Sequence, residues 1–415
     1  MQLDARAVRA ARILAQGLPA PRGARLTAQA ERSGWQRTIG GAEAYLGLRA
    51  RAPKLRRGDL EALVAEGEFA VVPAARGCIY LVPRAEAPLA LAIAGRLCAA
   101  RDARDAERAG IRAGELDEVG DAVVAELRAG GPRTTDGLRR TLGDAVRGLG
   151  ERGKRVGVSS TLPPALRRLE FAGRIARTPV GGRLDHEKYE WRAADRVSTA
   201  GAELPEDPVE LHARLLTGFV ARAGVTTLAS FCTWSGLTKR DATAALQHAD
   251  CVRGAAEGIT GEALCSPLLD KLLRRTDQAL ATVALLPFED NLVHLTGGVA
   301  DWVDPAKHDL QVPVWGNMKD KKPTTRLGDS KHVSWRTILA DGRICGFWDY
   351  DPEEGAVITG IFDPPGKAAR RQIDALAQGT SEFLRDEIGH ARSFSIDTEA
   401  DLTRRCGLLR ELGAR

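Results

Sequence analysis

Apolar residues at helical spacing, followed by two short apolar strands, form the clearest pattern in the chain. Leu162, Leu166 and Leu169 share one face of a helix, while the two arginines after Leu166 project elsewhere. Ser160 or Thr161 can cap this helix, and the Gly181–Gly182 turn connects strands near 175–176 and 184–191. A second amphipathic helix, with its own hydroxyl cap, begins at 134–138. This order predicts a winged helix, whose second helix fits a DNA groove.

The helix–turn–helix plan is predicted twice more, with varied lengths. Helices near 26–32, 42–51 and 60–64 precede a hairpin formed by 69–72 and 78–82. Helices at 211–220, 224–236 and 239–246 follow the central stretch. The three stretches share little identity, so we interpret them as tandem copies of one architecture.

The pattern changes beyond Val283 to short apolar runs separated by turns. These runs lie at 283–287, 291–295, 337–348 and 356–362, and Asp341–Gly342 is a strong hairpin turn. A helix over 367–388 and a strand near 394–396 complete a β-rich region. We therefore expect an α+β fold of three tandem winged-helix domains followed by a C-terminal β-barrel-like domain. The expected domains are 1–100, 101–200, 201–280 and 281–415.

Composition limits the classes of protein to which the chain can belong. The 415 residues are 44% hydrophobic and 28% charged, typical of a globular protein, and no apolar run is long enough to span a membrane. Without a signal-peptide pattern, we expect a cytoplasmic location. The seven cysteines contain no CxxC pair and the seven histidines no HxH or HxxxH group, so no metal is expected. No phosphate-binding glycine motif is present, so no cofactor is expected, and no heptad seam calls for more than a monomer.

Charge is distributed unevenly along the chain. Residues 1–200 hold 35 Lys and Arg against 24 Asp and Glu, a balance of +11, whereas the remainder is acidic. A basic front half favours a polyanionic partner, which the predicted winged helices identify as double-stranded DNA. A solvated arginine-rich surface is the alternative. The candidate DNA-binding residues are Arg37, Arg76, Arg152, Lys154, Arg155, Arg167, Arg168, Arg174 and Arg177.

Four segments in order along the chain resemble the AlkZ/YcaQ family of winged-helix DNA glycosylases. They are 76–82 (RGCIYLV), 222–236 (RAGVTTLASFCTWSG), 285–291 (LLPFEDN) and 340–348 (ADGRICGFW). The resemblance implies three winged-helix units and a β-barrel around a concavity that fits DNA. It also implies excision of alkylated purines, including bulky or crosslinking adducts, by hydrolysis of the N-glycosidic bond.

The signature of that family is a Gln–apolar–Gln or Gln–apolar–Asp triplet in the first unit. Its counterpart here is Gln36–Arg37–Thr38, which keeps only the first residue. A Gln carboxamide can orient water, because its oxygen accepts and its NH2 group donates hydrogen bonds. Thr38 can hold water but cannot be an anionic base. The resemblance therefore implies Gln36 and Thr38 as catalytic residues; helix capping is the alternative role for both.

Two further side chains are candidates for the same cleft. Tyr80 could stack on a base or sugar, although its strand position also suits core packing. Asp290 could hold a water or cap a turn, and we favour the structural role.

Two main functional hypotheses follow. The first is a monofunctional, metal-free DNA repair glycosylase. The second is a non-catalytic DNA-binding protein or regulator on the same scaffold, which the altered triplet favours. A protein–protein adaptor is a weaker third reading, because fold does not fix function.

Overall fold

One order of elements occurs three times in the computed structural model, which describes residues 2–20, 23–194, 204–313, 324–330 and 333–413. The order is a helix, a short strand, two further helices (three in the second copy) and a hairpin. In each copy the short strand pairs with the second strand of the hairpin. We call these copies the first, second and third unit.

The first unit contains α2 (Leu26–Ser33), β2 (Gln36–Arg37), α3 (Glu43–Arg49), α4 (Arg57–Ala65), β3 (Phe69–Pro73) and β4 (Ile79–Pro83). The second contains α6 (Glu115–Gly130), β5 (Arg133–Thr134), α7 (Thr135–Leu142), α8 (Gly150–Arg155), α9 (Leu162–Phe171), β6 (Ile175–Pro179) and β7 (Tyr189–Ala193). The third contains α10 (Pro208–Ala223), β8 (Val225–Thr226), α11 (Leu228–Ser235), α12 (Lys239–Leu246), β9 (Val252–Ala256) and β10 (Ala263–Cys265). The sheet orders are β2-β4-β3, β5-β7-β6 and β8-β10-β9, and β1 (Gln2–Leu3) adds to β9 in parallel.

Local sequence explains the helices of the second unit. The predicted apolar face of α9 is buried, as its leucines Leu162, Leu166 and Leu169 pack in the core of this unit. The Thr134 hydroxyl accepts from the Gly137 amide and so caps α7, as expected. The predicted hydroxyl cap of α9 is wrong, because Thr161 stands at the N-cap but its Oγ1 accepts from the Arg147 amide instead.

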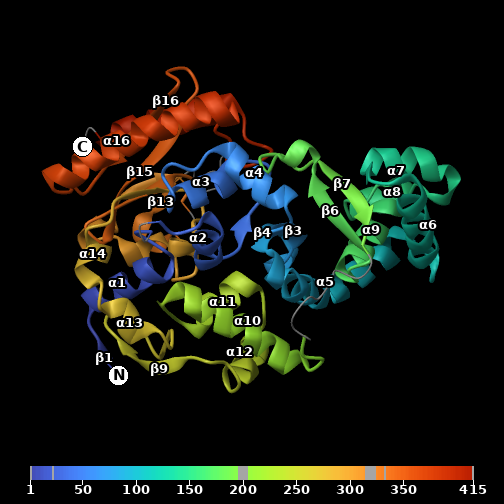
Figure 1. Cartoon of the computed structure of the whole chain (residues 1–415), viewed down its shortest axis with the longest axis horizontal. Helices are drawn as coiled ribbons and strands as arrows, with labels where there is room; N and C mark the ends of the chain where they lie inside the picture. The colour runs from blue at the N-terminus through green and yellow to red at the C-terminus, as the bar shows by residue number, and fades with distance from the viewer. Residues whose placement is uncertain (1, 21–22, 195–203, 314–323, 331–332, 414–415) are drawn as a thin grey trace.

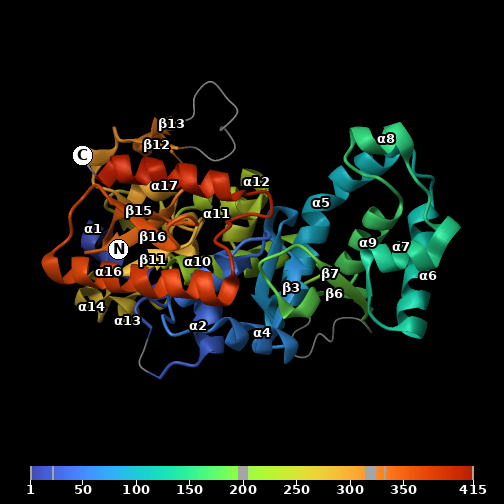
Figure 2. The same ribbon diagram turned by 90° about the horizontal axis from the view of Figure 1, so that it is seen from above.

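The second unit projects to one side of the molecule (Figures 1 and 2). The long helix α5 (Ala87–Ala109) joins it to the first unit and ends at Gly110, whose φ of 73° suits glycine. The first unit lies between the second unit and the C-terminal region, and the third unit packs on the first through a shared aromatic core that includes Trp35, Phe219 and Trp234.

The C-terminal region contains an open sheet rather than a barrel. Its strands are β11 (Ala284–Leu286), β14 (Arg336–Ala340), β15 (Arg343–Asp351) and β16 (Ala356–Ile361), in the order β11-β14-β15-β16. Helices α16 (Lys367–Glu382) and α17 (Glu399–Gly413) lie on opposite sides of these strands (Figure 2). All five residues of β14 are buried, because both faces of the sheet are covered. The expected barrel is therefore wrong for the described residues. These apolar runs form an open sheet that is covered on both faces, and they do not close around an interior.

Two smaller expectations for this region also fail. The run at 291–295 is a short helix, α15 (Asn291–His294), which begins at a capping aspartate. Residues 394–396 form turns and no strand. The Asp341–Gly342 turn is confirmed, with φ of 50° and 71° at its two residues.

Candidate active site

The Gln36–Arg37–Thr38 triplet lies on the short strand of the first unit. Gln36 and Arg37 pair with Leu81 and Tyr80 of β4, and the Thr38 amide donates to the Ile79 carbonyl at 3.0 Å. Hydrogen bonds to β4 thus fix the backbone that carries Gln36.

The Gln36 side chain has a defined orientation. Its Nε2 donates to the Ser33 hydroxyl at 3.1 Å and to the Gly34 carbonyl at 3.2 Å, and the residue is only 7% exposed. Its carboxamide oxygen lies over Gly47 of α3, where an added Cβ would be 2.4 Å from Oε1. A glycine at this position therefore leaves the space that the carboxamide fills, and the NH2 donors fix which way the oxygen points.

Gln36 lines a small pocket between the first unit and the loop before α15. The space open to the centre of a water molecule is about 10 Å³, which admits about one water and no nucleobase. The other residues around it are Arg37, Glu43, Tyr80, Pro287, Phe288, Glu289, Asp290, Asn291 and His294.

Asp290 anchors this loop. Its two carboxylate oxygens accept from Arg51 Nη1 and Nη2 at 2.6 and 2.9 Å, and both side chains are buried. Arg51 also donates to Gln16 and to the Gly47 carbonyl, so the pair ties three segments together. Asp290 further caps α15 through the Leu292 amide. It lines the pocket, but its carboxylate is held by these structural bonds.

Asn291 fastens the same loop to the turn before Gln36. Its Nδ2 donates to the Ser33 carbonyl at 2.7 Å and to the Trp35 carbonyl at 2.9 Å. Sequence reasoning did not single out this residue, although it lies in the LLPFEDN segment. The segment itself could have indicated Asn291, because the polar residues at its end do not fit a buried apolar strand.

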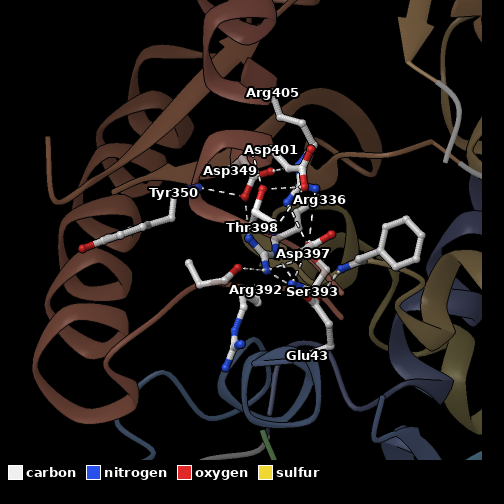
Figure 3. A network of polar contacts seen from close by, with 12 residues as sticks. Glu43, Arg336, Asp349, Tyr350, Arg392, Ser393, Asp397, Thr398, Asp401 and Arg405 are labelled. Carbon is white, nitrogen blue, oxygen red and sulfur yellow. Dashed lines mark hydrogen bonds and ion pairs between the residues drawn. The ribbon is translucent and has the colours of Figure 1, made fainter. Parts of the chain in front are cut away.

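A buried charge network supports the loop from the C-terminal sheet (Figure 3). Glu43 of α3 accepts from the Phe288 amide at 2.7 Å, and its other oxygen accepts from Arg336 of β14 at 2.5 and 3.0 Å. Arg336 also bonds Asp349, which Arg405 pairs from α17. Burial raises the pKa of Glu43, and Arg336 opposes that rise. The network thus links the wall of the pocket to the C-terminal sheet and α17.

At the rim of the pocket, Arg37 forms an ion pair with Glu289. The two side chains are 22% and 12% exposed, more than the other ion pairs at the pocket. Glu289 has a φ of 53°, in the left-handed region that side chains rarely adopt. Thr38 is buried, its hydroxyl has no hydrogen-bond partner among the described residues, and it is absent from the pocket lining.

Tyr80 belongs to both the core and the pocket. It is 1% exposed and contacts Trp35 edge to face, with ring centroids 6.2 Å apart. Burial raises the pKa of its phenol, so the ring stays neutral at ordinary pH. The ring is packed in the core, which leaves no free face for stacking on a base in this conformation.

Comparison with known proteins decides the family. The family model described as "DNA glycosylase AlkZ-like" matches residues 27–383. The chain belongs to the AlkZ-like DNA glycosylase family. Its fold is also similar to that of the solved Streptomyces sahachiroi DNA glycosylase AlkZ, with a TM-score of 0.66 at 17% identity over 94% of this chain and 98% of that one. No protein with a curated description matches the sequence.

Membership in the AlkZ-like family makes the chain a hydrolase that acts on DNA. A resemblance first stated on four short segments is thereby confirmed over most of the chain. Because the substrate is DNA, the exposure and the partners of the candidate DNA-binding cations become relevant.

The cations of the second unit differ in how freely they face solvent. Arg152 and Arg155 of α8 are exposed and make no hydrogen bond or ion pair within the described part of the chain. Lys154, Arg168 and Arg174 are exposed and pair with neighbouring carboxylates of Glu151, Asp117 and Asp121.

Three other candidate DNA-binding arginines are engaged in contacts within the protein. Arg167 pairs with Asp102 and packs on Phe171. Arg177 pairs with buried Glu170 and lies over the rings of Tyr189 and Trp191. Arg76, in the first-unit hairpin, lies 3.3 Å from the His294 ring nitrogen and against Gly236.

Two further observations describe the AlkZ-like chain as a whole. None of the helices in the described ranges is long and apolar enough to cross a membrane. The same ranges bring together no group of three or more His, Cys, Asp and Glu side chains that could hold a metal ion.

Proposed function

We propose that the chain hydrolyses the N-glycosidic bond of N7-alkylated purines in duplex DNA, with Gln36 orienting the attacking water. In this proposal the three repeated units are winged-helix modules, within domains that divide near residues 100, 200 and 280. No lysine is assigned a nucleophilic role, so the product is an abasic site and not a strand break.

The orientation of Gln36 in a pocket the size of one water carries this proposal. The Ser33 and Gly34 acceptors hold its NH2 group, so its oxygen is a fixed acceptor for a water proton. An N7-alkylated purine is cationic and leaves without strong protonation. The enzyme therefore needs mainly a positioned water and stabilisation of positive charge on the sugar, which the carboxylate-lined pocket supports.

The size of the pocket supports bulky or crosslinked adducts as substrates. The space of about 10 Å³ excludes a purine, so in this conformation the base stays outside while water approaches the sugar from within. A base that is not enclosed can carry a large substituent. Thr38 is absent from the pocket lining, so this proposal does not use the assisting role predicted for it.

In this proposal the second unit supplies the residues that bind the DNA backbone. Arg152 and Arg155 are the cations most available to phosphates, and Lys154, Arg168 and Arg174 can exchange weak surface ion pairs for phosphate contacts. Arg177 is not among these DNA-binding residues, because buried Glu170 and two aromatic rings already hold it.

The test uses a duplex oligonucleotide with one N7-methylguanine. After incubation, hot alkali converts abasic sites into strand breaks that a gel resolves. We expect breaks at the modified base with the wild-type protein and a loss of about 100-fold in single-turnover rate with Gln36→Ala. Salt-dependent duplex binding without breaks would instead support the non-catalytic DNA-binding hypothesis.

A further inference from the structure

Three carboxylates line the pocket beside Gln36, and two of them are fully used by the fold. The oxygens of Glu43 accept from Arg336 and from the Phe288 amide. Those of Asp290 accept from both Arg51 amino groups. These groups are buried and fastened to buried arginines, so neither can take up a proton and pass it to solvent without breaking the support of the loop.

Glu289 is the third carboxylate, and its setting differs. It remains partly open to solvent at 12% exposure, and its partner Arg37 is more open still. Its backbone is held at a φ of 53° between two anchored neighbours, Phe288 and Asp290. A left-handed backbone is unfavourable for a residue other than glycine, and the anchored neighbours on both sides hold Glu289 in it. A conformation held in this way at the rim of a pocket indicates a role in the chemistry.

We propose that Glu289 is the general base of the reaction, an inference that rests on the glycosylase function proposed above. Gln36 orients the water, and the Glu289 carboxylate takes one of its protons. The water oxygen bonds to C1′ of the sugar as the bond from C1′ to the purine nitrogen breaks and its electron pair leaves with the base. A cationic N7-alkylpurine thereby departs neutral, the sugar becomes a hemiacetal, and Glu289 releases its proton to solvent.

This proposal explains how the altered triplet can be competent. Thr38 is absent from the pocket lining, and its hydroxyl is no base at neutral pH. The missing anion comes instead from the loop before α15, where Glu289 lines the same pocket as Gln36. Arg37, from the strand that carries Gln36, holds that carboxylate at the rim through their ion pair.

The experiment compares single-turnover excision rates of the full chain at saturating N7-methylguanine duplex. We expect Glu289→Gln to lower the rate by about 100-fold while changing duplex affinity by less than about 2-fold. The matched control is Glu387→Gln, which removes a half-buried carboxylate that pairs with Arg56, is absent from the pocket lining and should leave the rate unchanged. Glu289→Ala should regain part of its lost rate when formate is added, because formate supplies the missing carboxylate.

A double variant separates the base from a structural ion pair. If Glu289 served only to neutralise Arg37, the variant Arg37→Gln/Glu289→Gln would recover the rate lost in Glu289→Gln, because no unpaired charge remains. The general-base role predicts that it stays as slow as Glu289→Gln. Recovery in the double variant, or a Glu289→Gln rate within about 3-fold of an active wild type, would overturn the proposal. A wild type that makes no abasic sites would refute the proposed function itself, a different result.

Discussion

The first and second units share one sheet order, although the second has one helix more, and the ion pairs of the two units differ in burial. In the first unit, Arg51 pairs with Asp290 and Glu43 pairs with Arg336, with all four side chains at 6% exposure or less. In the second unit, Lys154 and Arg174 pair with carboxylates at exposures between 45% and 77%. The first unit is packed between other parts of the molecule, whereas the second stands apart (Figure 2).

This difference shows how one scaffold can serve two purposes. A buried ion pair fixes geometry, because breaking it leaves a charge without solvent, and such pairs hold the loop around Gln36. A surface ion pair is weak and exchanges readily, so its cation is available to a phosphate. We therefore expect substitutions at the buried pairs of the first unit to change stability or chemistry, and substitutions of the exposed cations of the second unit to change DNA affinity.

The largest expected effect comes from breaking the buried pair. Arg51→Met leaves the Asp290 carboxylate buried without its cation and should lower the free energy of unfolding by about 3–5 kcal/mol. Arg174→Met breaks a surface pair in the second unit and should cost less than about 1 kcal/mol. Urea denaturation measures both, and equal losses would contradict the distinction.

The next effect is on chemistry alone. Gly47→Ala places a Cβ 2.4 Å from Gln36 Oε1, and the flexible carboxamide, rather than the backbone, has to move. Because misplacement of a reacting group by about 1 Å can cost about 100-fold, we expect a rate loss of up to that size with unchanged stability. Gly407→Ala in α17 adds a methyl group into open space and is the control. An unchanged rate in Gly47→Ala would show that the carboxamide position is unimportant.

A smaller effect is expected from the second unit. Arg152→Gln/Arg155→Gln should weaken duplex binding by about 10-fold and reduce the slope of log K against log salt by about 2, as each lost phosphate contact removes about 0.9. Arg370→Gln/Arg371→Gln on α16 makes the same charge change on another surface. Equal weakening by both double variants would point to net charge and not to a defined DNA-binding face.

The smallest expected effect is a loss of stability of the second unit at acidic pH. Arg147 hydrogen bonds lower the pKa of Glu115 to about 2, below its usual 4.5. The stabilisation by this pair is therefore present in full above about pH 4.5 and is lost as the pH falls toward 2. The protection factors of the β7 amides against hydrogen exchange should therefore fall over that range in the wild type, and less steeply in Arg147→Gln. Parallel curves for the two proteins would contradict this assignment.

Local signals predicted the units well and long-range contacts poorly. The α9 face, the Thr134 cap and the Asp341–Gly342 turn follow from residues near each other in the sequence, and all three are confirmed. The barrel was wrong because an apolar run does not reveal what covers each face of a strand.

The candidate site was predictable only in part, for a related reason. Gln36 and the LLPFEDN segment could be singled out, but more than 250 residues separate Gln36 from Asn291 and no spacing rule joins them. Arg177 was predicted to bind DNA from its charge and its place in a predicted winged helix, whereas its enclosure by Glu170, Tyr189 and Trp191 depends on the folded unit.

The most direct test of this division of roles measures single-turnover excision of N7-methylguanine and duplex affinity side by side. We predict that Gln36→Ala lowers the rate at saturating DNA by about 100-fold with affinity unchanged. Arg152→Gln/Arg155→Gln should lower affinity with the saturated rate unchanged. A Gln36→Ala protein that excises at the wild-type rate would contradict the central claim that the first unit carries the chemistry.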